Sequence, residues 1–175
     1  AGSSFQTEFL RCVDVVEAGR YPYTGQLGIL SEQDHEKVAE ALKLVHGEEL
    51  AQKDFRKISD GQRQRILLAK AICQEAEILI LDEPTSFLDV RYKLEFLTIL
   101  KDLVREKQIA VILSLHELDL AQRISDVVLC IRNHTVDRIG TPDEIFTDAY
   151  ITNLYGITCG SYESLYGTME LPAPT

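Results

Sequence analysis

The sequence has few of the features that mark zinc proteins, membrane proteins or nucleic-acid binders. Its four cysteines, Cys12, Cys73, Cys130 and Cys159, are far apart, and without a CxxC or Cys/His cluster we expect no zinc site. No apolar run reaches the length of a membrane span and no signal peptide is recognisable, so we expect a soluble, cytosolic protein. Acidic residues outnumber basic ones by 28 to 18, and the net charge of -10 argues against a nucleic-acid binder, which needs a basic face.

The remaining composition is that of an ordinary globular protein. With 175 residues, of which 45% are hydrophobic, the chain can form one domain with a real core. Cys73 and Cys130 lie in apolar runs, so we expect both to be small core residues. A reducing compartment is the simplest setting for such cysteines.

The stretch from Ile78 to Asp89, which reads ILILDEPTSFLD, organises the rest of the sequence. Its four leading aliphatic residues predict a strand buried on both faces, as in a parallel sheet covered by helices. Asp82 and Glu83 follow at the carboxyl end, where open α/β sheets bind ligands. Adjacent carboxylates are costly there unless a cation joins them, and Mg²⁺ on a nucleotide phosphate would supply that charge. The alternative is a strand that ends in a charged turn.

A capped helix precedes this strand. Ser59 is a good N-cap for a helix that extends to about Gln74, and Gly61 lies in the first turn. A glycine inside a helix costs about 1 kcal/mol relative to alanine, and it suits a place where something approaches the backbone closely. The serine hydroxyl, the free N–H groups and the helix dipole together form a natural phosphate site. An ordinary helix with an incidental glycine is the alternative.

A second buried strand is predicted from Ile109 to Leu115, with His116 at its carboxyl end. His116 would then lie at the same edge of the sheet as Asp82 and Glu83. A lone histidine is usually structural or solvated, so its position leaves a functional and a structural interpretation both open.

Periodicity and capping signals predict the other elements. Further helices are expected over 8–18 (ended by Gly19), from Ser31 to a close at Gly47, and over 90–107, 117–124 and, in part, 145–157. A hairpin is expected over 127–131 and 135–139, and Thr141 is expected to cap the helix that follows it. The loop from Arg20 to Gly28 contains Tyr21-Pro22-Tyr23, which is either an exposed contact surface or a packed turn.

Three motifs in fixed order resemble those of ATP-binding cassette (ABC) ATPases. Residues 58–62 (ISDGQ) resemble the signature sequence LSGGQ, and residues 78–83 resemble the Walker B strand with its catalytic glutamate. Residues 86–89 look like the D-loop, and residues 115–117 like the switch-histidine loop. The stretches GRYPYTG, SLHELDLAQRISD and TNLYGI look most like ATPase subunits of importers for iron-siderophores, haem or cobalamin. The resemblance covers nearly the whole chain.

The resemblance implies roles for the residues at the strand ends. Asp82 would hold Mg²⁺, and Glu83 would act as general base on the attacking water. His116 would contact the γ-phosphate of ATP. Asp89 would help to join the two halves of a dimer of ATPase subunits. These groups supply the positioning and charge neutralisation that phosphoryl transfer needs.

The resemblance also implies that the signature acts across a dimer. Ser59, Gly61 and Gln62 would meet the γ-phosphate of ATP bound to the other subunit. Asp60 stands where the family usually has glycine, and we expect its carboxylate to point away from the triphosphate. Gln6 is a candidate for the family's Q-loop glutamine.

The phosphate loop of the family is the main departure. No glycine is followed by lysine, so the sequence has no GxxxxGK[ST]. The family places that loop before every motif seen here. We therefore expect either an internal fragment or a chain whose early part is missing from the printed sequence.

The implied fold class is α/β: an incomplete ABC ATPase of the P-loop NTPase (RecA-like) type with a helical signature subdomain. The expected division is a helical subdomain over 1–75, the C-terminal part of the ATPase core over 76–158, and an irregular tail over 159–175.

The implied function is an ATP-binding and hydrolysing subunit that powers an ABC importer from the inner face of the cell membrane. Its cofactors would be ATP and Mg²⁺, and its partners a second ATPase subunit and a transmembrane permease, without nucleic acid. A soluble ATPase of the same superfamily, of the DNA-repair type, is a second hypothesis, although the chain has neither a coiled-coil nor a zinc insertion. A third is that the chain by itself is an inactive module that only folds and pairs.

Overall fold

The computed structural model describes residues 9–25, 28–86 and 88–157, which divide into two compact units between Ser114 and Leu115. Gln6, Cys159 and the predicted tail lie outside these ranges. The mixture of helices and parallel strands is that of the expected α/β class. Within the described residues, no helix has both the length and the apolar character needed to cross a membrane.

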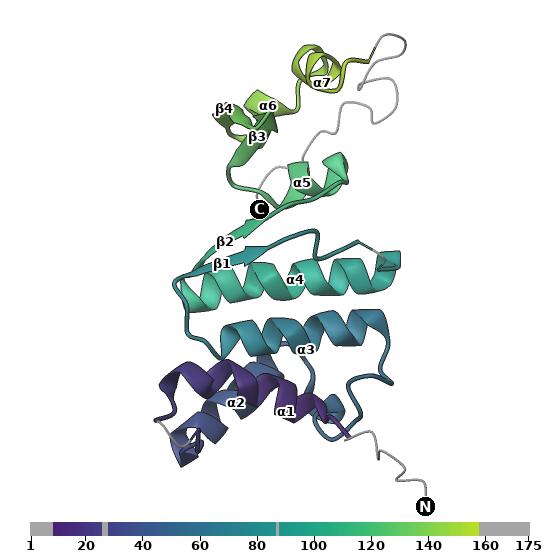
Figure 1. The fold of residues 1–175 in the computed structure, drawn as a ribbon. Helices are drawn as coiled ribbons and strands as arrows, with labels where there is room; N and C mark the ends of the chain where they lie inside the picture. Colours follow the sequence, from purple (N-terminus) through teal and green to yellow (C-terminus); the bar gives the residue numbers. More distant parts are fainter. Residues whose placement is uncertain (1–8, 26–27, 87, 158–175) are drawn as a thin grey trace, which may run out of the picture. The chain divides into compact units, whose positions relative to one another are not determined.

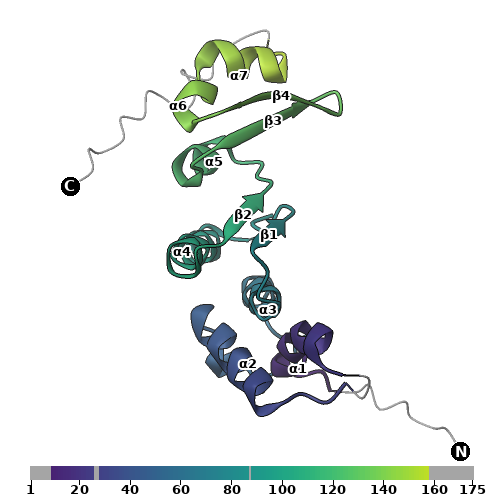
Figure 2. The same cartoon turned by 90° about the vertical axis from the view of Figure 1, so that its left-hand side faces the viewer.

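The first unit contains most of the helices. They are α1 (Cys12–Glu17), the 3₁₀ helix η1 (Ala18–Tyr23), α2 (Glu32–Leu44), the 3₁₀ turn η2 (Glu48–Leu50), α3 (Asp60–Ile72) and α4 (Val90–Lys107). In Figures 1 and 2, α3 lies between α4 on one side and the pair α1 and α2 on the other. The predicted helices in this part are therefore confirmed, with small differences at their ends.

The first difference concerns the segment around Gly19. The helix predicted from Glu8 begins at Cys12, and the chain continues after it as η1, where a loop was predicted. Gly19 packs against α3 so closely that a Cβ atom would lie 2.4 Å from the carbonyl oxygen of Lys70. This glycine permits a close approach between two segments; it does not end a helix.

The second difference concerns the end of α2. Its start agrees with the prediction, because Ser31 caps the helix and forms a reciprocal capping box with Asp34. Its end was predicted at Gly47, but the left-handed residue is His46, with φ of 50°. The N–H of Gly47 then donates to the carbonyl of Leu42 at 2.8 Å, as in a Schellman motif shifted by one residue.

Apolar side chains from all these helices form the core of the first unit. Cys12, Val16, Val38, Leu42, Leu50, Ile66, Leu68, Cys73, Phe96 and Leu100 are among those buried. Cys130 is buried in the second unit, so both cysteines that were predicted to be core residues are confirmed as such.

Two parallel strands complete the first unit. β1 (Ile78–Leu81) pairs with β2 (Ala110–Leu113), and Leu81 lies opposite Leu113. Leu79 is buried, whereas Ile78 is 55% exposed and Ile80 is 73% exposed. The prediction that β1 is buried on both faces is therefore wrong for the described residues. The prediction that the second strand is buried is wrong as well, because Ile112 of β2 is 57% exposed. Side chains alternate across a strand, and the described elements cover only the face on which Leu79 lies.

The second unit contains short elements only. They are α5 (Leu118–Ile124), β3 (Val128–Arg132), β4 (Thr135–Gly140), α6 (Pro142–Ile145) and α7 (Asp148–Tyr155). β3 and β4 form the predicted hairpin, and its turn residues Asn133 and His134 have φ of 51° and 63°. Two left-handed residues in a two-residue turn match the twist of the strands. Thr141 is the N-cap residue of α6, as predicted, and its backbone N–H donates to Oε2 of Glu144 at 2.8 Å.

Candidate functional site

Asp82 and Glu83 lie at the carboxyl end of β1 and share one partner, Ser114, at the carboxyl end of β2. The Ser114 hydroxyl donates to Oδ1 of Asp82 at 2.7 Å. The same oxygen accepts the backbone N–H of Glu83 at 2.8 Å. The N–H of Ser114 donates to the carbonyl of Leu81 at 3.1 Å, which continues the pairing of the two strands. The acidic pair is thus attached to the sheet through a single serine.

Glu83 has an unusual backbone. Its φ is 45°, in the left-handed region that side-chain-bearing residues seldom adopt. The turn that follows holds this conformation: Ser86 donates its N–H to the carbonyl of Glu83 at 3.1 Å and its hydroxyl to Oε2 of Glu83 at 3.1 Å. Backbone strain of this kind clusters at functional sites, where the surroundings hold a side chain in one direction.

The N-terminus of α3 is capped within the predicted signature. Ser59 accepts the N–H of Gln62 at 3.3 Å, and the side-chain oxygen of Gln62 accepts the N–H of Ser59 at 3.1 Å. Asp60 is exposed and forms an ion pair with Arg63 at 2.7 Å. Its carboxylate is therefore neutralised one turn along its own helix.

The close approach to Gly61 comes from another helix of the same unit. A Cβ atom at Gly61 would lie 2.7 Å from Cγ of Tyr92, on α4. Asp89 is the N-cap of α4 and accepts the backbone N–H of Tyr92 at 3.0 Å. Gly61 and Asp89, which are far apart in the sequence, are thus connected through Tyr92.

These two clusters lie toward the same end of the first unit. Figure 1 shows that α3 and α4 both begin at the end toward which β1 runs. The capped N-terminus of α3, the acidic pair after β1 and the N-cap of α4 all belong to that end. Helix N-termini carry partial positive charge, which favours an anionic ligand on this side.

The other predicted site residues are placed differently. His116 belongs to the second unit and follows Ser114 by two positions. Gln6 lies outside the described residues. Sequence reasoning missed Ser114 and Tyr92. Ser114 carried a signal, because a hydroxyl at the carboxyl end of a parallel strand lies at the same edge of the sheet as a neighbouring strand's carboxylates.

The segment around Arg20 is attached to the end of α3. The Arg20 side chain is only 5% exposed, and its guanidinium pairs with Asp34 at 2.8 Å and donates to the carbonyl of Cys73 at 2.6 Å. Tyr23 donates its hydroxyl to the carbonyl of Gln74, and its ring lies under Arg20. Tyr21 is 57% exposed. The segment is therefore a packed turn on which Tyr21 and also Tyr23, at 52%, remain exposed.

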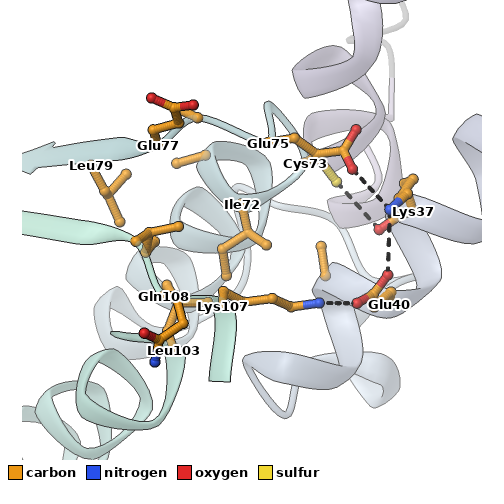
Figure 3. A pocket seen from close by; sticks show the side chains of 14 residues that line it. Lys37, Glu40, Ile72, Cys73, Glu75, Glu77, Leu79, Leu103, Lys107 and Gln108 are labelled. Atoms are coloured by element: carbon orange, nitrogen blue, oxygen red, sulfur yellow. Dashed lines mark hydrogen bonds and ion pairs between the residues drawn. The ribbon is translucent and has the colours of Figure 1, made fainter. Parts of the chain in front are cut away.

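A cavity of about 310 Å³ lies between α2, the last turns of α3 and α4, and the start of β1 (Figure 3). Its charged groups pair with one another, since Lys37 bonds Glu75 at 2.8 Å and Lys107 pairs with Glu40. Glu77 and Leu79, at the beginning of β1, line it. The cavity is thus at the opposite end of the strand from Asp82.

The residues at the carboxyl end of β1 fit a magnesium ion that is bound together with phosphate. In the described part of the chain, no three His, Cys, Asp or Glu side chains gather as a metal site. Mg²⁺ does not require such a group, because it usually takes one or two carboxylates and completes its shell with water and phosphate oxygens. Asp82 is exposed, and its Oδ2 leaves room for such a contact beside the bond from Ser114 to Oδ1.

Comparison with known proteins identifies relatives over most of the chain. A family model described as ABC transporter matches residues 4–86. An uncharacterised ABC transporter ATP-binding protein of Methanocaldococcus jannaschii is 41% identical over 90% of this chain and 54% of its own length. A probable siderophore transport system ATP-binding protein of Bacillus subtilis is 34% identical over 92% of this chain and 59% of its own length. Other relatives are named for cobalamin import and ferric enterobactin transport.

A solved structure agrees with these relatives. An inward-facing conformation of a putative metal-chelate type ABC transporter contains a chain that matches with a TM-score of 0.80 and 28% identity. The match covers 89% of this chain and 62% of that one. The chain thus spans little more than half the length of the curated relatives above. It shares the fold of the solved structure over the part that matches.

Proposed function

The chain belongs to the family of ABC transporter ATP-binding proteins, and from that premise we propose that it contributes to ATP hydrolysis that powers the import of a chelated nutrient. The relatives named for siderophore transport and cobalamin import support an iron-siderophore, haem or cobalamin as the cargo class. The protein would work at the inner face of a membrane, attached to a permease.

The acidic pair after β1 is the observation that carries this proposal. Asp82 would hold Mg²⁺ on the phosphates of ATP, and Glu83 would orient and deprotonate the attacking water. The strained backbone of Glu83 and its bonds from Ser86 support this role, because a general base must be held in one direction. His116 would contact the γ-phosphate.

The signature would act on a second subunit. Ser59, Gly61 and Gln62 form the capped start of α3, whose partial positive charge suits a phosphate presented by another chain. A solved relative is described as the dimeric structure of a transporter cassette, which supports a homodimer or pseudo-dimer. Asp89 would join the two halves next to this contact. The ion pair of Asp60 with Arg63 supports a carboxylate turned away from the triphosphate.

The proposed subdivision follows the same roles. Residues 1–75 would form the helical signature subdomain, with the exposed ring of Tyr21 toward the permease. Residues 76–158 would contribute the C-terminal part of the ATPase core. Gln6 would belong to the Q-loop.

The test is a pair of matched substitutions in the protein as its gene encodes it. Glu83→Gln removes the base, so we expect ATP hydrolysis to be lost while nucleotide binding persists. Glu77→Gln makes the same change at an exposed residue before β1 and should leave both unchanged. Unchanged hydrolysis in Glu83→Gln would rule out the assignment of the general base.

One observation favours a second candidate for the 175-residue chain taken alone. The sequence has no GxxxxGK[ST], and the backbone N–H groups of that loop are what cradle the phosphates of a nucleotide. By itself the chain would then be a module that folds and pairs without turning over ATP. Calorimetric titration of the chain with MgATP distinguishes an ATP-binding subunit from a module that only folds and pairs. A micromolar affinity for MgATP would contradict this second candidate.

A further inference from the structure

We propose that Ser114 is a positioning residue that fixes Asp82 and Glu83 together through one hydroxyl group. The contacts of Ser114 in the structure are enough to support this positioning role. The effect of Ser114 on turnover rests on the proposed function. Nothing in the family motifs discussed above assigns a role to this position.

The hydroxyl of a serine has one proton and two lone pairs, and both kinds of group are used here. The hydroxyl donates a hydrogen bond to Oδ1 of Asp82 at 2.7 Å, and one of its lone pairs accepts the N–H of Glu83 at 2.8 Å. A single oxygen therefore determines the direction of one carboxylate and the backbone of the next residue. Because Oδ1 of Asp82 is engaged, Oδ2 is the oxygen that remains for a cation.

The position of Ser114 is itself set by the sheet. Leu81 and Leu113 are opposite one another in the parallel pair, and the N–H of Ser114 adds the next bond to the carbonyl of Leu81 at 3.1 Å. Because Ser114 is held by the paired strands, its hydroxyl holds the turn that follows β1 in a fixed position relative to the sheet.

The backbone of Glu83 needs such a restraint. A residue with a side chain at φ of 45° persists only when its surroundings hold it there. The bond from its N–H to Ser114 and the bond to its carbonyl from Ser86 restrain the peptide groups on both sides of its Cα. Without Ser114 the N–H of Glu83 loses this bond, and the direction of the Glu83 side chain is held less closely. A base misplaced by about 1 Å can lose two orders of magnitude in rate.

The experiment uses two substitutions of equal shape, Ser114→Thr and Ser114→Val. Ser114 is exposed, so the added methyl group has room in both. Only threonine keeps the hydroxyl. Amide hydrogen exchange of Glu83, followed by NMR in the 175-residue chain, should be at least about tenfold slower in the wild type and Ser114→Thr than in Ser114→Val.

The second readout is turnover by the protein as its gene encodes it. We expect kcat to fall by about tenfold or more in Ser114→Val, with the KM for ATP nearly unchanged, and to be largely restored in Ser114→Thr. Equal values in the two variants, in exchange or in kcat, would overturn the proposal, because shape and not the hydroxyl would then matter. A wild-type protein without ATP hydrolysis would contradict the proposed function alone, since the exchange of Glu83 still decides the role of Ser114.

Discussion

The ring of Tyr92 on α4 occupies the space that a side chain at Gly61 on α3 would need. A Cβ atom there would lie 2.7 Å from Cγ and 2.9 Å from Cδ1 of the ring. Packing inside one chain thus requires a glycine at position 61. Because Asp89 accepts the N–H of Tyr92, Asp89 and Gly61 share this one aromatic neighbour.

Gly61→Ala should therefore lower stability, although alanine is the better helix former by about 1 kcal/mol. Overpacking a filled site costs about 1–3 kcal/mol, so after the gain in helix propensity we expect a net loss of about 1 kcal/mol in urea unfolding. In a Tyr92→Ala background the space is empty, and the same substitution should become neutral or stabilising. Additive effects of the two substitutions would contradict the packing explanation.

The stability of α4 should depend on the cap at Asp89, independently of any role in pairing. Asp89→Ala removes the acceptor for the N–H of Tyr92 and should cost about 1 kcal/mol. Serine is an equally good cap, so Asp89→Ser should unfold at nearly the same urea concentration as the wild type. If Asp89 also joins two subunits, Asp89→Ser should weaken nucleotide-dependent dimerisation in analytical ultracentrifugation, which separates the two roles.

Acid should destabilise the helical part through Asp34. The hydroxyl and N–H of Ser31, with the guanidinium of Arg20, lower the pKa of Asp34 to about 2 in the folded state. The carboxyl of an unfolded chain has a pKa of about 3.9. A pKa that is lower in the folded state gives stability that is present above about pH 4 and is lost as the pH falls toward 2.

The measurement for Asp34 is the urea midpoint between about pH 2 and 7. Asp34→Asn should be less stable at neutral pH and should lose less stability on acidification than the wild type. Asp143→Asn, an exposed change in the second unit, serves as the control and should follow the wild-type profile. If the urea midpoint of Asp34→Asn fell with decreasing pH as steeply as that of the wild type, other carboxylates would be the cause of the acid sensitivity.

Cys73 should react slowly with alkylating reagents. Burial raises the pKa of its thiol from 9.0 to about 11, so the thiolate population at pH 8 falls by about 100-fold. Iodoacetamide labelling followed by peptide mass mapping should show slow modification in the native protein and fast modification in urea. Equal rates in the two conditions would mean that the end of α3 opens readily.

Much of this fold could be predicted because local signals agreed with one another. Ser31, Ser59 and Thr141 each start a helix, as their N-capping side chains predict, and the hairpin follows from two strand-like runs on either side of a polar turn. The helix from Val90 to Lys107 has the predicted bounds. These elements are decided by neighbours within one or two turns.

The differences arise where distant contacts decide the outcome. Gly19 was predicted to stop a helix, but it is set by its close approach to Lys70 on α3. Gly61 was predicted to permit a close approach, but a local pattern could not identify Tyr92 as the neighbour. The left-handed residue after α2 is His46 and not the adjacent glycine, because the helix ends one residue earlier than its composition suggests. Asp82 and Glu83 could be selected from sequence, but their common attachment to Ser114 depends on strand register.

The anchoring of the Arg20 segment has a mechanical consequence. Arg20 and Tyr23 bond to Cys73, Gln74 and Glu75, which stand directly before β1 in the chain. A displacement of the turn that carries Tyr21 would therefore act directly on the segment before β1, the strand that Asp82 and Glu83 follow. It would not have to pass along the length of α3. The buried Arg20 therefore holds the surface turn and the segment before β1 together as one unit.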